Sequence, residues 1–177
     1  MKKEKFIQNW IGLNMLLLIV FIGGQSCTAQ KSQSELMNSY ELRMNGQADS
    51  AKVLLLEMSQ KYPEDAMVWF ELSRCTEHLG LSNPRDMEKS IEASLSYINK
   101  ANKIEEGNAK YLLYKAKFQT LEFYMNLKMG GGDEGVKLED IEETYQKVFQ
   151  LDDKLRLKTL RSGQAMLLYQ AVMAFHQ

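Results

Sequence analysis

The two histidines and two cysteines are the residues of this sequence that most readily bind metals or act as nucleophiles. His78 and His176 are far apart, and neither has a second histidine, cysteine or acid at the spacing that a zinc or iron site requires. Cys75 lies in an apolar helical stretch, so we expect a buried thiol with a packing role. His78 is about one helical turn away and is the one group placed to activate it. These residues predict neither a metal centre nor a nucleophile and its base.

The acidic residues also lack the spacing of a general acid and base. Adjacent acids point apart on a helix, so they form solvated faces. The pairs in question are Glu105 and Glu106, Asp133 and Glu134, Glu142 and Glu143, and Asp152 and Asp153. The glycines at 130–132 have no following lysine with serine or threonine, so they form no phosphate loop. We therefore expect no enzyme activity and no cofactor.

The elements that carry these residues read as helices throughout the body of the chain. Apolar residues recur at spacings of three and four, and no β-branched run alternates with polar residues. Gly46, Asn83 with Pro84, and Asn108 after Gly107 are helix-end signals, and the glycine-rich segment 130–135 is a turn. The pattern predicts an all-α fold of about seven helices, near 32–45, 48–61, 65–79, 84–105, 109–128, 137–151 and 155–176.

The first 29 residues have the three-part plan of a secretory signal. A basic start is followed by the apolar stretch 13–22 and a short polar tail. This stretch is shorter than the ~20 residues of a membrane-spanning helix, which disfavours a permanent anchor. We expect the chain to be exported, with residues 32–177 forming a helical domain.

Two routes of signal cleavage fit the sequence. Small residues before Gln30 resemble the Ala-Gln ending common in signals of Bacteroidetes-type bacteria, which would release a periplasmic domain after Ala29. The alternative resembles a bacterial lipoprotein, with the signal ending before Cys27 and that cysteine lipidated in the outer membrane. A membrane contact is expected only through this lipid. In both cases Cys75 is the one thiol of the folded body, so no intramolecular disulfide can form.

The charge balance excludes partners that need a basic protein. The formal net charge is −1, and removing residues 1–29, which contain three lysines and one glutamate, leaves 19 basic and 22 acidic residues. No basic excess remains to bind nucleic acid or an anionic membrane surface.

A repeat with a period of 34 residues lies between Gly46 and Gly80. Trp69, Leu72, Ser73 and Thr76 follow the pattern W-x₂-L-G-x₂-Y, with serine and threonine in the last two positions. Ala51 and Leu55 follow the pattern A-x₃-F, and Pro63 comes twelve residues after Ala51. The chain thus resembles the tetratricopeptide repeat family, which implies antiparallel helix hairpins stacked as a short right-handed solenoid.

Each repeat position has a physical reason. Ala51 and Ser73 are small because two helices approach closely there, whereas Trp69, Leu72 and Leu55 fill the wider space beside them. We expect Gly46 and Gly80 to allow sharp turns at corresponding corners of successive hairpins, and Pro63 to end the second helix. Residues 32–106 match well. Later matches are Ser94 with Ile98 and Ala101, after nine inserted residues, and Ile141 with Tyr145 and Val148. A helical bundle that imitates repeats in its first half is the alternative fold.

The resemblance implies a concave surface, formed mainly by the first helix of each pair, that binds peptides or partner proteins. Carried over by position, its residues are Leu36, Tyr40 and Arg43 in the first pair, Phe70, Arg74 and Glu77 in the second, and Leu113, Lys117 and Thr120 in the third. Partners 34 residues apart, such as 43 and 77, should form adjacent rows. Aromatic groups beside arginines suit an extended acidic or C-terminal segment. Alternatively, Tyr40 and Phe70 seal the packing between pairs, and Arg74 and Glu77 form an ordinary solvated pair.

The segment 165–175 is apolar except for Gln170, so a helix there has no polar outer face. It is either buried within the monomer or the basis of self-association or partner binding through residues 160–175.

The sequence thus predicts an exported scaffold for protein–protein interaction in the cell envelope. The alternative is a tetratricopeptide-like outer-membrane lipoprotein that binds a small ligand or glycan in a helical cleft.

Overall fold

The structure, a computed structural model, describes residues 32–128 and 135–155 of the chain. The helices are, in order, a helix over residues 32–44, α2 (Ala48–Lys61), α3 (Ala66–Ser82), the short 3₁₀ helix η1 (Pro84–Asp86), α4 (Met87–Ile104), α5 (Ala109–Lys128) and α6 (Leu138–Leu151). These residues contain no strand, so the all-α prediction is confirmed for this part of the chain. The predicted helix at 155–176 and the predicted association segment 160–175 lie outside the described residues, as do the signal and Cys27.

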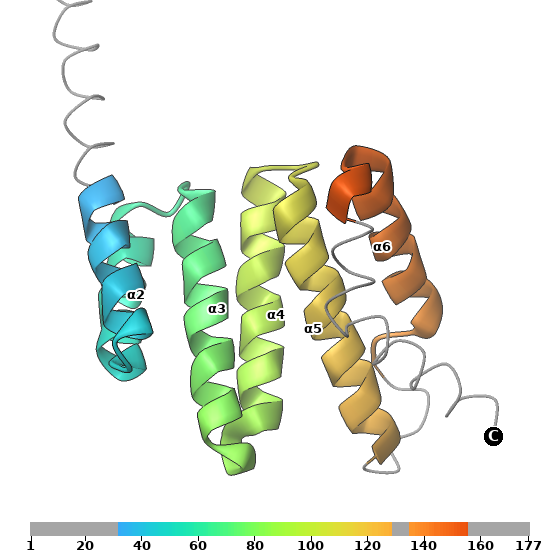
Figure 1. The fold of residues 1–177 in the computed structure, drawn as a ribbon, viewed down its shortest axis with the longest axis horizontal. Coiled ribbons are helices and arrows are strands. Elements are labelled where there is room, and N and C mark those ends of the chain that lie inside the picture. Colours follow the sequence, from blue (N-terminus) through green and yellow to red (C-terminus); the bar gives the residue numbers. More distant parts are fainter. Residues whose placement is uncertain (1–31, 129–134, 156–177) are drawn as a thin grey trace, which may run out of the picture.

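The helices form a row in which neighbours in the sequence are also neighbours in space. Figure 1 shows α2 to α6 following one another across the molecule, with the helix over 32–44 beside α2. The connections between the pairs α2 and α3, α3 and α4, and α4 and α5 are only a few residues long, so these helices run antiparallel.

Three apolar clusters lie along the row in place of one central core. The first joins the helix over 32–44, α2 and α3 around Leu55, Leu72 and Cys75. The second joins α3, α4 and α5 around Phe70 and Tyr111. The third joins α5 and α6 around Ala116, Phe123, Ile141 and Tyr145. Each helix pair is therefore stabilised chiefly by its immediate neighbours.

The buried positions recur along the row. Ala51 and Leu55 of α2 are fully buried, and so are Ser94 and Ile98 of α4, 43 residues later. Ile141 and Tyr145 occupy the corresponding positions of α6 and are also buried. The register predicted for the second and third pairs is confirmed in this sense, because the predicted inward positions face inward.

The turn at Gly46 and the turn at Pro63 follow the predictions. Gly46 has a φ of +79°, which favours glycine, and it ends the helix over 32–44. The helix α2 ends at Lys61, two residues before Pro63. The indole Nε1 of Trp69 donates a hydrogen bond of 2.8 Å to the carbonyl oxygen of Pro63. Two repeat-defining residues are thus joined directly.

The prediction that Gly80 forms a turn is wrong. Gly80 is helical, and α3 continues to Ser82 before Asn83 begins the turn. A β-carbon at Gly80 would lie 2.4 Å from Cβ of Ser90 on α4. The glycine is needed for the close approach of α3 and α4, and the side chain of Asn83 caps the new helix start by accepting from the amide of Arg85. Gly46 and Gly80 are therefore near corresponding helix ends but have different roles.

Candidate binding surface

Three helices that are not consecutive in the sequence meet on one surface through charged and aromatic side chains. On the helix over 32–44, the guanidinium of Arg43 lies 5.2 Å from the ring centre of Tyr40. Its Nη2 donates to Oε2 of Glu71 on α3 at 3.4 Å. Arg43 and Glu71 are both buried, so the ion pair between these two helices is shielded from water.

The same carboxylate binds a second guanidinium. Nη1 of Arg74 donates to Oε1 of Glu71 at 2.8 Å, so the two oxygens of Glu71 serve two arginines. The Arg74 guanidinium also lies 5.5 Å from the ring centre of Phe70 and 5.7 Å from that of Tyr114 on α5. Cation–π contacts of this kind favour a fixed orientation of the guanidinium.

The contacts continue onto α5. The ammonium of Lys117 forms an ion pair with Oε1 of Glu77 on α3 and lies 5.4 Å from the ring centre of Tyr114. Lys110, one turn earlier on α5, lies 4.4 Å from the ring centre of Phe70. We call the connected side chains the charged ladder: Tyr40, Arg43, Glu71, Arg74, Glu77, Tyr114 and Lys117. The helix over 32–44 contributes to one end of the ladder, α3 to its middle and α5 to its other end.

The charge of this surface differs from that of the chain. Arg43, Arg74 and Lys117 outnumber Glu71 and Glu77 by one, and Lys110 adds another positive charge nearby. A local basic excess on an otherwise slightly acidic protein attracts anionic groups to this face.

Five of the predicted surface residues belong to the charged ladder: Tyr40, Arg43, Arg74, Glu77 and Lys117. The prediction that Arg43 faces Glu77 is wrong, because Arg43 pairs with Glu71 and Glu77 pairs with Lys117. Helix α3 presents its acid nearest to Arg43 six residues earlier than the 34-residue spacing implies.

Three predicted surface residues lie beneath the surface. Phe70 is fully buried, with ring centres of Tyr111 and Tyr114 each 5.0 Å away, so its assignment to the exposed surface is wrong and it supports the ladder from below. Thr120 is buried and donates to the carbonyl oxygen of Ala116 at 2.7 Å. Leu36 and Leu113 are partly buried and pack on apolar clusters.

Glu71 and Tyr114 are ladder residues that sequence reasoning missed. Glu71 has one local signal, since it stands three residues before Arg74 and can pair with it on one helix face. Its contact with Arg43, 28 residues earlier in the chain, has no local signal. Tyr114 was noted only as part of an apolar face of α5.

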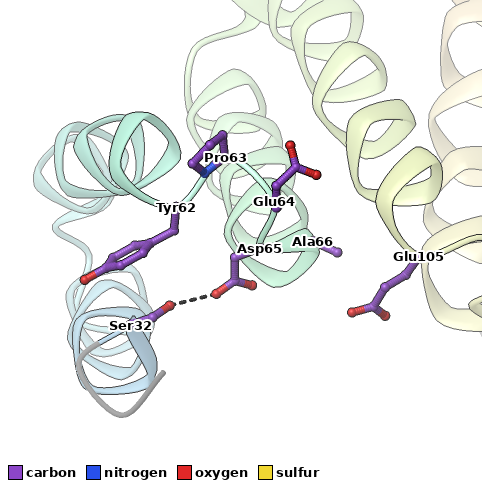
Figure 2. Close-up of a pocket in the computed structure, with 7 residues that line it drawn as sticks. All are labelled: Ser32, Tyr62, Pro63, Glu64, Asp65, Ala66 and Glu105. Atoms are coloured by element: carbon purple, nitrogen blue, oxygen red, sulfur yellow. Dashed lines mark hydrogen bonds between the residues drawn. The ribbon is translucent and has the colours of Figure 1, made fainter. Parts of the chain in front are cut away.

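A shallow depression of about 430 Å³ lies at a different place, around the turn between α2 and α3. Figure 2 shows Ser32 and Asp65 facing each other there, and the Ser32 hydroxyl donates to Oδ2 of Asp65 at 2.7 Å. Oδ1 of Asp65 accepts from the amide of Met67 and so caps α3. The lining residues are Ser32, Tyr62, Pro63, Glu64, Asp65, Ala66 and Glu105. The polar groups of Ser32 and Asp65 are thus used to start α3.

The residues considered for chemistry lie apart from the ladder's charged groups. Cys75 is buried, and its Sγ donates to the carbonyl oxygen of Ala48 at 3.1 Å. Burial raises the pKa of the Cys75 thiol to about 11, so the thiol stays protonated at neutral pH. Within residues 32–128 and 135–155, no three His, Cys, Asp or Glu side chains are grouped as a metal site would need.

Comparison of the chain with family models, curated proteins and solved structures finds no match. Among the helices of the described part, none has the length and apolar character needed to cross a bilayer.

Proposed function

We propose that this protein is an exported scaffold of the tetratricopeptide type, in which helix hairpins stack as a right-handed solenoid and the charged ladder binds a segment of another protein. The partner is an envelope protein, because the leader-like residues 1–29 direct the domain out of the cytoplasm.

The stacking part of the proposal is supported by recurrence. The fully buried pairs Ala51 with Leu55 and Ser94 with Ile98 are the same positions of successive hairpins. The same 43-residue step relates Asp65 to Asn108, and each caps the first helix of its pair through a side-chain oxygen that accepts from a backbone amide. Equivalent caps and equivalent buried positions are what a hairpin repeat requires.

The charged ladder is the single observation that carries the binding role. It draws on the first helices of three pairs, which the repeat places along one face, and it leaves a local excess of positive charge. Tyr40, Met37 and Met44 on the helix over 32–44 are exposed beside it. Exposed apolar side chains next to partly shielded cations suit a segment with acidic and apolar residues.

The test is co-purification from the native envelope with a variant that combines Tyr40→Ala and Arg74→Glu. The matched control combines Leu56→Ala on α2 with Lys147→Glu on α6, which changes size and charge similarly at exposed positions outside the ladder. We expect the ladder variant to lose partners that the wild type and the control retain. Equal sets of partners for both variants, with unchanged melting temperatures, would contradict the binding role.

A further inference from the structure

Glu71 has an arrangement that packing alone does not explain. Its carboxylate is almost fully buried, and it is shared between Arg43, which is equally buried, and Arg74, whose side chain is 24% exposed. The contact with Arg74 is the shorter one, 2.8 Å against 3.4 Å. A buried carboxylate with two cationic partners leaves one positive charge uncompensated at this point of the surface.

The exposure of the two arginines separates their roles. Arg74 is the guanidinium that a partner can reach, and the rings of Phe70 and Tyr114 hold its orientation. Arg43 is too deep for direct contact with a large ligand, so it acts on Arg74 through Glu71. With Arg43 present, Glu71 is divided between two cations. Without Arg43, Glu71 would neutralise Arg74 alone.

We propose that Glu71 is the specificity-determining residue of the charged ladder, with Arg43 as its positioning residue. Together they leave Arg74 with one net positive charge, which binds one carboxylate of an anionic protein segment. The inference rests on the proposed function and extends it, because it states the charge that this part of the partner must carry. A doubly charged phosphoryl group is disfavoured, since the buried carboxylate repels the second charge.

The test is a double-mutant cycle with fluorescence anisotropy. The probe is a labelled peptide with three glutamates at alternate positions, and a peptide with lysines in their place is the control probe. Arg43→Gln should weaken binding of the acidic probe by about tenfold or more, because Glu71 then cancels Arg74. Adding Glu71→Gln to that variant should restore binding to near the wild-type value, because Arg74 regains its charge.

The matched cycle uses Lys147 and Glu143, an exposed ion pair on α6, with Lys147→Gln and the double change to Gln. It repeats the same steps in net charge, and we expect changes of less than about twofold. A purely structural role for Glu71 predicts the opposite order in the first cycle, since a second substitution in a packed network would then weaken binding further. That result would overturn the inference.

If Arg43→Gln does not fold, Glu71→Gln alone decides the question. This variant leaves two uncompensated guanidiniums, so the acidic probe should bind more tightly and with a steeper dependence on salt concentration. Unchanged or weaker binding would overturn the inference. Failure of the wild type to bind any acidic probe would instead contradict the proposed function, and the inference with it.

Discussion

The hydroxyl of Ser94 on α4 donates a hydrogen bond of 3.0 Å to the backbone carbonyl oxygen of Ser73 on α3, and both residues are fully buried. A side chain can reach the backbone of a neighbouring helix in this way only where the two helices lie very close together. The two serines occupy the small-residue positions of the second helix pair. Helix contact at these positions is therefore part of what holds each pair together.

Replacing Ser94 by Leu should destabilise the protein by about 2–4 kcal/mol, because a larger side chain forces α3 and α4 apart and the hydrogen bond is lost. Ser96→Leu is the control, since Ser96 is exposed on the same helix. The free energy of unfolding in urea measures both changes. Equal effects of the two variants would show that the close contact contributes nothing.

Gly80→Ala should also destabilise the protein, although alanine favours a helix over glycine by about 1 kcal/mol. The reason is the 2.4 Å between the new β-carbon and Cβ of Ser90, which requires the helices to move. In a Ser90→Gly background the same substitution should be neutral or stabilising. Chemical unfolding of the four proteins in this cycle gives the answer, and a stabilising Gly80→Ala in the wild-type background would contradict the contact.

The helix positions could be predicted from the sequence because periodicity and helix-end residues are local signals. Gly80 shows the limit of such signals, because glycine serves a turn and a close helix contact equally well. The repeat spacing placed Phe70 on the correct helix but not at the correct depth, which depends on how Tyr111 and Tyr114 of α5 pack over it. Glu71 was missed because its second arginine comes from another helix.

Stability should fall as the pH rises from about 9 to 12. Burial raises the pKa of Cys75 from 9.0 to about 11 and that of Tyr111 from 10.0 to about 12. In the unfolded chain these groups ionise at lower pH than in the folded protein, so the native state binds more protons in this range and alkali favours unfolding. Their contribution is complete below pH 9 and is lost as the pH passes the folded values.

Urea unfolding at pH 8, 9.5 and 11 checks this dependence. The variant Cys75→Ala lacks one of the two groups, so its free energy of unfolding should decline less steeply than that of the wild type, whatever its value at pH 8. Parallel declines for the two proteins would show that the Cys75 thiol does not contribute.

The most direct measurement for the binding surface is site-specific photo-crosslinking in the native envelope. A benzophenone amino acid is placed at Tyr40, beside the charged ladder, or at Leu56 on α2. These positions are similarly exposed, at 40% and 37%, so access of a random neighbour is comparable. The account predicts a discrete crosslinked partner from position 40 that Arg74→Glu removes, and none from position 56. The same products from both positions, or a product from position 40 that Arg74→Glu leaves unchanged, would contradict it.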